Sequence, residues 1–161
     1  DIQVDTRTTR LDAEALLTEV GQVDLVVDCT DNFATRHAIN RACVHHGKPL
    51  VSGAAVRFDG QISVFDTRDP ASPCSRCLFP EGAGVGDVTC AAMGVFAPLV
   101  GIVGSMQAAE AIKVIAGIGE PLVGRLLILD ATDMKWHSVR VRRDPGCTVC
   151  AQRNAGVPIK E

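Results

Sequence analysis

Alternating and clustered apolar residues along the chain predict an α/β fold. Residues 2–6 (IQVDT) alternate apolar and polar side chains and predict a short strand. Residues 12–20 have one apolar helical face and begin with Asp12, a residue type that caps helices. Residues 23–30 (VDLVVDCT) form an apolar, β-branched run, which is typical of a central parallel strand with a polar C-terminal tip.

The same pattern continues through the next forty residues. Apolar positions in 32–46 predict a helix that stops at Gly47, because glycine favours the left-handed backbone at a helix C-terminus. Residues 49–56 predict a strand, and 57–65 place Asp59-Gly60 between alternating runs, a strong hairpin signal. The strand–helix–strand order predicts a sheet with helices packed on its faces.

The second half of the chain predicts a long loop, a long helix and a closing hairpin. The loop runs from residue 66 to about residue 93 and is rich in glycine and proline, and a loop of this length is expected to be functional or mobile. A helix follows over about 97–116, and residues 125–132 and 136–143 predict two antiparallel strands.

Composition and charge limit the function classes. The net charge of −3 does not favour nucleic acid or an anionic membrane as a partner. The polar residues 1–10 do not resemble a signal peptide. The apolar stretch 93–106 is shorter than the roughly 18 uncharged residues of a membrane span, so it predicts a buried core helix. We expect a cytoplasmic protein in a reducing compartment.

Four of the seven cysteines form two C-x-x-C pairs, Cys74/Cys77 and Cys147/Cys150. Each pair lies in a loop beside a proline, and together they offer four thiolates to one tetrahedral Zn²⁺ ion. Redox activity is the alternative, but redox pairs open a helix after a strand, and neither pair here has that setting. We therefore predict a structural zinc site that attaches the C-terminal tail to the domain.

Two further residues are candidates for chemistry. Asp31 follows a parallel strand and precedes a helix, where α/β sheets bind ligands, so it could hold a Mg²⁺ ion that bridges nucleotide phosphates. The alternative is that Asp31 is only the helix N-cap. Cys90 lies late in the glycine-rich loop and is either a nucleophile or acceptor, or an inert thiol. Cys29 and Cys43 are expected to be core thiols.

Five stretches taken together resemble the MoeB/ThiF/HesA family of adenylyltransferases, which activate ubiquitin-like sulfur carriers. They are DLVVDCTDNFATRHAIN, PLVSGAAVRFDGQISVF, CSRC, TCAAMGVFAPLVGIVGSMQAAEAIKVIAG and GCTVC, and the resemblance extends from about residue 2 to residue 150. The run S-G-A-A-x-R-x-x-G-Q at 52–61 is more similar to the MoeB type than to the ThiF type.

The resemblance implies a fold, a reaction and a set of ligands. The fold would be a Rossmann-like, mainly parallel sheet continued by antiparallel strands. The reaction would be ATP-dependent adenylylation of the C-terminal glycine of a MoaD-like carrier, which ends in Gly-Gly, for molybdenum cofactor synthesis. Asp31 matches the magnesium ligand, Asn32 the adjoining ATP contact and Cys90 the loop cysteine. The zinc ligands match Cys74, Cys77, Cys147 and Cys150. Family members are typically homodimers.

One departure from the family is large. Members begin with a strand and a G-x-G-x-x-G loop, and nothing in this chain matches them. We therefore expect residues 1–161 to be the C-terminal part of the domain, without about 100 residues of nucleotide-binding half, and to be inactive alone. ThiF-type activation of a thiamine-pathway carrier, a non-catalytic carrier-binding module and an unrelated zinc-stabilised or redox domain remain as alternatives.

Overall fold

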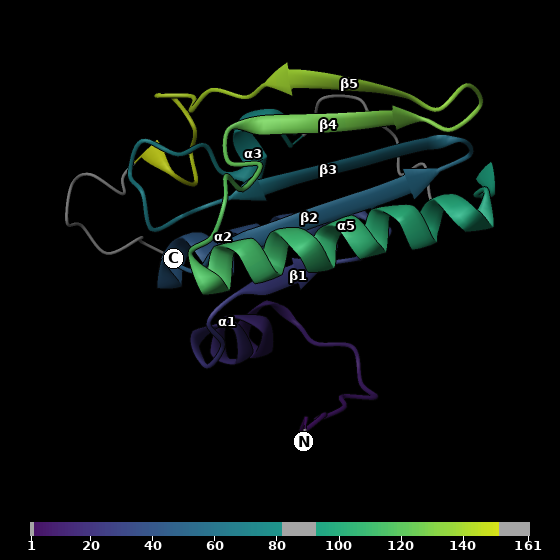
Figure 1. Ribbon diagram of the computed structural model, residues 1–161. Helices are drawn as coiled ribbons and strands as arrows, with labels where there is room; N and C mark the ends of the chain where they lie inside the picture. Colours follow the sequence, from purple (N-terminus) through teal and green to yellow (C-terminus); the bar gives the residue numbers. More distant parts are fainter. Residues whose placement is uncertain (1, 82–92, 152–161) are drawn as a thin grey trace.

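A computed structural model describes residues 2–81 and 93–151 as a five-stranded sheet with helices on both faces (Figure 1). The elements in chain order are α1 (Ala13–Gly21), β1 (Val26–Asp28), α2 (Phe33–His46), β2 (Leu50–Val56), β3 (Asp59–Phe65), α3 (Ser75–Leu78), α5 (Ala97–Ala116), β4 (Arg125–Asp130) and β5 (Lys135–Arg140). The strand order is β1-β2-β3-β4-β5. β1 pairs in parallel with β2, and the remaining pairs are antiparallel. The expected parallel-to-antiparallel sheet is confirmed.

Alternate residues of β2 face two different helix layers. Leu50 packs against α1 and α2 together with Val20, Ile39 and Phe65. Val51, the next residue, packs on the opposite face in a cluster that includes Val114 of α5. Because side chains of a strand point alternately to its two faces, β2 holds both layers together.

Helix α5 lies close to β2 and β3 because two glycines give it room. A Cβ atom at Gly60 would come within 2.8 Å of Leu99 Cδ1, and one at Gly53 within 2.4 Å of Gln107 Cδ. α5 has the length and apolar composition of a membrane span, although a single such helix is weak evidence because core helices pass the same test. The expected core helix is buried on one face only, since Ile112 and Ile115 are 60% and 67% exposed.

Local signals placed the helix ends correctly. Asp12 accepts a hydrogen bond from Ala15 N and caps α1. Gly47 ends α2 in the left-handed conformation, with φ 62°. The predicted helix over 97–116 matches α5 at both ends.

Three strand predictions need correction. Residues 2–6 form no strand, and Ile2 is almost fully exposed, because the alternating pattern has no pairing partner among the described residues. β1 was expected in the centre of the sheet but lies at one edge of the described sheet. The β2–β3 hairpin is confirmed, but Asp59 and Gly60 begin β3, and the chain turns at Arg57, which has φ 51°.

Candidate functional site

Asp31 and Asn32 occupy the turn between the C-terminal end of β1 and the N-terminus of α2. Asn32 is the N-cap: its Oδ1 accepts a hydrogen bond from Thr35 N at 2.9 Å. Its Nδ2 donates to Asp31 Oδ1 at 3.3 Å. The interpretation of Asp31 as a mere N-cap is therefore wrong, and its exposed carboxylate keeps oxygens that a cation could bind.

A small cavity of about 170 Å³ adjoins Asp31. Its walls come from the end of β1, from β2, from α5 and from Arg36 of α2, so it lies where parallel strands present their C-terminal ends. We call residues 29–32, together with Arg36 and Gln107, the strand-tip site.

Arg36 is the only cationic side chain among the described residues that line this cavity. Its Nε donates to Thr30 O at 3.1 Å, and one terminal nitrogen also reaches Thr30 O and, at 3.5 Å, Gly53 O. Its guanidinium lies 5.9 Å from the centre of the Phe33 ring. Arg36 thus holds backbone carbonyls of the turn and of β2 together.

Buried polar groups that the sequence analysis missed support the same turn. Asp28 is almost completely buried; its Oδ1 accepts hydrogen bonds from Thr30 N at 2.9 Å and Thr30 Oγ1 at 2.7 Å. Its Oδ2 has no hydrogen-bond partner in the described part of the chain. Gln107 is buried in α5 and donates to Asp28 O at 2.8 Å. A glutamine within the mostly apolar first part of α5 was the signal that could have revealed it.

Cys74, Cys77, Cys147 and Cys150, which we call the cysteine cluster, come together as predicted. All four Sγ atoms lie within 4.8 Å of one another. The Sγ–Sγ distances are 3.7 Å for Cys74–Cys147 and 3.5 Å for Cys77–Cys150. A tetrahedral Zn–S₄ site with bonds of about 2.3 Å has S–S edges of about 3.8 Å, so the cluster could hold zinc.

Donors from the protein support individual sulfurs of the cysteine cluster. Asn40 Nδ2 lies 3.6 Å from Cys74 Sγ, and the Asp144 N–H donates to Cys77 Sγ at 3.4 Å. The pKa of Cys77 is lowered to about 4, chiefly by the hydrogen bond with Cys74. The same hydrogen bond raises the pKa of Cys74, and burial raises the pKa of Cys150. Binding of a cation would favour release of these remaining thiol protons.

The other three cysteines differ from one another. Cys43 is buried as predicted, and burial raises its pKa to about 12. The prediction for Cys29 is wrong, since this residue is exposed and its Sγ lies 3.5 Å from Gln107 Oε1. Cys90 lies outside the described residues.

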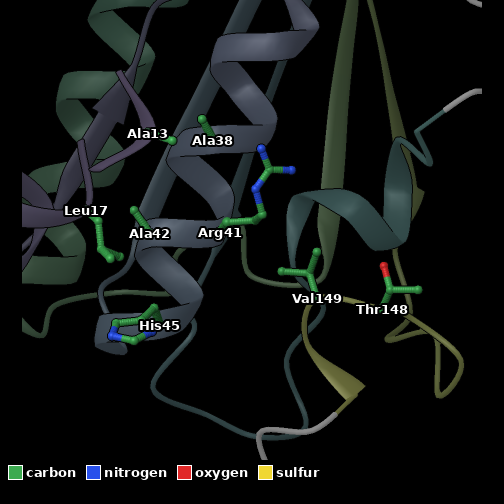
Figure 2. A pocket seen from close by; sticks show the side chains of 8 residues that line it. All are labelled: Ala13, Leu17, Ala38, Arg41, Ala42, His45, Thr148 and Val149. Carbon is green, nitrogen blue, oxygen red and sulfur yellow. The ribbon is translucent and has the colours of Figure 1, made fainter. Parts of the chain in front are cut away.

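A second cavity, of about 440 Å³, lies between α1, α2 and the second cysteine pair (Figure 2). Leu17 of α1, Ala42 and His45 of α2, and Val149 of the Cys147–Cys150 loop line it. It follows the C-terminal half of α2, whereas Asp31 precedes the N-terminus of that helix. This cavity therefore does not belong to the strand-tip site.

A comparison with protein families matches residues 1–149 to the model of the ThiF family. Among curated proteins, the chain is 47% identical over 153 residues to a sulfur carrier protein adenylyltransferase from Thermus thermophilus. It is 46% identical over 145 residues to the molybdopterin-synthase adenylyltransferase of Escherichia coli. The matches cover 92% and 88% of this chain but 56% of each relative, so the chain spans about half the length of these relatives.

A search of solved structures finds the same fold in E. coli MccB crystallised with ATP. The TM-score is 0.71 at 22% sequence identity, over 89% of this chain and 44% of that chain. At 22% identity this likeness shows only that the two chains share a Rossmann-like α/β fold.

Proposed function

Because this chain belongs to the ThiF family, we propose that it supplies part of an ATP-dependent adenylyltransferase that activates a ubiquitin-like sulfur-carrier protein. The observation that carries the proposal is the exposed Asp31 carboxylate, which follows the C-terminal end of β1. Asp31 does not cap α2, because Asn32 is the N-cap of that helix. Ligands of open α/β sheets bind at this edge.

In the proposed reaction, a carboxylate oxygen of the carrier's C-terminal glycine attacks the α-phosphorus of ATP. The bond from that phosphorus to the α–β bridging oxygen breaks, and pyrophosphate leaves with the electron pair. The products are pyrophosphate and the carrier acyl-adenylate. Asp31 would hold a Mg²⁺ ion, with Asn32 beside the nucleotide; when bound, this ion neutralises phosphate charge. A sulfur donor would later displace AMP to form a thiocarboxylate.

The residues of the strand-tip site provide one side of such an active site. Arg36 is the only cationic side chain in the described lining, and two of its nitrogens already donate hydrogen bonds to backbone carbonyls, so few N–H donors there are left for a triphosphate. Adenylyl transfer depends on positioning and on neutralising phosphate charge. We therefore infer that other cationic groups complete the site and that residues 1–161 alone form no adenylate.

We further propose that the cysteine cluster binds one structural Zn²⁺ ion. The Sγ–Sγ distances and the N–H donors at Cys74 and Cys77 support this assignment. Val44 of α2 packs beside the cluster, so the metal would join the Cys147–Cys150 loop to the body of the fold.

We propose that the carrier is of the MoaD type, with a Gly-Gly terminus. The S-G-A-A-x-R-x-x-G-Q run at 52–61 supports this choice. A relative named sulfur carrier protein ThiS adenylyltransferase, from E. coli, is 43% identical over 155 residues, so the thiamine-pathway carrier is the matched competitor. Equal amounts of both carriers in one assay would decide: faster activation of the thiamine-pathway carrier would overturn the MoaD assignment.

A homodimer is part of the same proposal. Val100, Ile112 and Ile115 leave an apolar strip exposed along α5, which supports a subunit contact there. Sedimentation analysis of the protein in its full natural length would test it. A monomer at micromolar concentration would contradict it.

The decisive test is Asp31→Ala in the protein at its full natural length. We expect ATP–pyrophosphate exchange in the presence of carrier to fall by about 100-fold or more, as when an electrostatic group of a transition state is removed. Carrier binding, measured calorimetrically, should persist. Asp24→Ala is the matched control, because Asp24 is exposed just before the start of the same strand. Near-normal exchange in Asp31→Ala would overturn the proposal. If the unsubstituted protein itself binds the carrier but catalyses no exchange, a non-catalytic carrier-binding module is favoured.

A further inference from the structure

We propose that Gln107 of α5 is a positioning residue that fixes the turn bearing Asp31 and thereby sets the affinity of the strand-tip site for a divalent cation. The inference rests on the proposed magnesium role of Asp31. Gln107 lines the cavity of the strand-tip site, and the role proposed for it acts through the backbone that precedes Asp31.

The side-chain amide of Gln107 contacts both parallel strands. Its Nε2 donates to Asp28 O at 2.8 Å and lies 3.5 Å from Val51 O. Its Oε1 lies 3.5 Å from Cys29 Sγ, on the residue after Asp28. One amide therefore joins the last residue of β1, the neighbouring strand β2 and the first residue of the turn. Since Gln107 is only 3% exposed, water does not substitute readily for these contacts.

The backbone of β2 is shaped to admit this amide. A Cβ atom at Gly53 would lie 2.4 Å from Gln107 Cδ and 2.5 Å from Oε1. Real Cβ atoms do not come this close, so glycine at this position allows the amide to lie against the strand. The close fit restricts the directions that the Gln107 donor can take.

Other side chains hold the backbone of Thr30 in the same turn. The Asp28 carboxylate accepts from Thr30 N, and Arg36 donates to Thr30 O from α2. Gln107 supplies the contact from α5, on the opposite face of the sheet. The residues immediately before Asp31 are thus held from both helix layers. Outer groups of this kind typically change metal affinity by roughly 10- to 100-fold when they are removed.

Glu110 provides a matched comparison one turn further along α5. It is also buried, and its Oε2 accepts a hydrogen bond from Leu122 N at 2.8 Å. Lys113 forms an ion pair with it. Glu110 thus ties α5 to the segment before β4, away from Asp31. Replacing either residue removes a buried polar contact of α5, but only the loss of Gln107 should loosen the Asp31 turn.

The experiment measures Mn²⁺ binding directly, by the electron paramagnetic resonance signal of free Mn²⁺. It uses the protein at its full natural length with an ATP analogue that carries a methylene group between the α- and β-phosphates. A protein-free sample of the same analogue gives the Mn²⁺ that the triphosphate binds by itself, and this amount is subtracted. Gln107→Met should weaken Mn²⁺ binding roughly 10- to 100-fold, whereas Glu110→Met should bind Mn²⁺ like the wild type despite lower thermal stability. Gln107→Glu keeps the size and the acceptor but replaces the Nε2 donor, and provides a second variant with the same expected loss.

Each outcome decides the inference. Equal weakening in Gln107→Met and Glu110→Met would show a general loss of stability and overturn it, as would unchanged binding in both Gln107 variants. Asp31→Ala separates this inference from the proposed function. If Asp31→Ala leaves Mn²⁺ binding unchanged, the magnesium role fails and the inference fails with it. If Asp31→Ala abolishes binding and the Gln107 variants do not weaken it, only the positioning role is wrong.

Discussion

The cysteine cluster and the strand-tip site differ in how completely the described residues build them. The cysteine cluster brings together four sulfur ligands within 4.8 Å, with N–H donors already aimed at two of them. The strand-tip site offers one exposed carboxylate and one arginine that is engaged with backbone carbonyls. A structural metal site needs all of its ligands when the chain folds, whereas a reaction site needs room for substrates and groups that arrive with them.

Helix α2 connects these two regions. Asn32 caps its N-terminus beside Asp31, and Asn40, in its middle, accepts from Ser75 N at 2.9 Å beside Cys74. One rigid helix therefore fixes the distance between the strand-tip site and the cysteine cluster. The comparison predicts that changes at the cluster mainly alter stability and that changes at the strand tip mainly alter chemistry.

The largest expected effect comes from removing the metal or one of its ligands. Cys150→Ser should lose zinc and expose residues 144–151 to proteolysis, because the cluster attaches the Cys147–Cys150 loop to the body of the fold. Structural zinc supplies on the order of 10 kcal/mol in small zinc domains. Plasma mass spectrometry and limited trypsin digestion would measure both effects. Cys29→Ser, which changes a cysteine outside the cluster, should keep its zinc; a chelated wild type as protease-resistant as the untreated protein would contradict the structural role.

An intermediate effect is expected from Asn40→Ala. The variant leaves the buried Ser75 N–H without its acceptor and removes the donor at Cys74 Sγ, which should cost about 1–3 kcal/mol of unfolding free energy. It should also speed transfer of zinc to a chelator. Urea denaturation and a colorimetric chelator assay would test this.

Arg41→Ala is the neighbouring control for Asn40. Arg41 is half exposed, and its ion pair with Glu81 is open to solvent, so its loss should cost less than about 1 kcal/mol. If the two variants were equally stable, Asn40 would have no special part in holding the first cysteine pair.

A smaller effect should separate the two residues of the strand tip. Asn32→Ala removes the cap of α2 and should lower the unfolding free energy by about 1 kcal/mol, while Asn32→Ser should restore most of it. Asp31→Ala should leave stability almost unchanged, because Asp31 caps nothing. Chemical denaturation of the three variants would check this. If Asp31→Ala lowers the unfolding free energy as much as Asn32→Ala does, Asp31 has a structural role.

The sequence predicted those parts of the molecule whose signals are local. Helix ends depend on a few neighbouring residues, so Asp12 and Gly47 marked them correctly. The two C-x-x-C pairs were joined correctly across a long separation, because four thiolates complete a familiar coordination shell.

The features that sequence could not predict depend on tertiary partners. Alternation in residues 2–6 indicates a strand only if another strand pairs with it, and none in the described chain does. Gln107 looked like one polar position in an apolar helix, and its role appears only once α5 meets the ends of β1 and β2. The exposure of Cys29 likewise follows from the position of β1 at the sheet edge.

The smallest expected effect on adenylation is that of Cys90→Ala. Cys90 lies outside the described residues; it is not one of the four cysteines of the cluster, and we assign it no part in binding Mg²⁺ or ATP. We expect ATP–pyrophosphate exchange within about twofold of the wild type, because removing a group outside the adenylation chemistry leaves the transition state unchanged. Any loss should fall on thiocarboxylate formation, measured by the mass of the carrier with a sulfide or persulfide donor. A large fall in exchange would place Cys90 in the adenylation step. The catalytic groups would then include the segment that carries Cys90 as well as the strand-tip site.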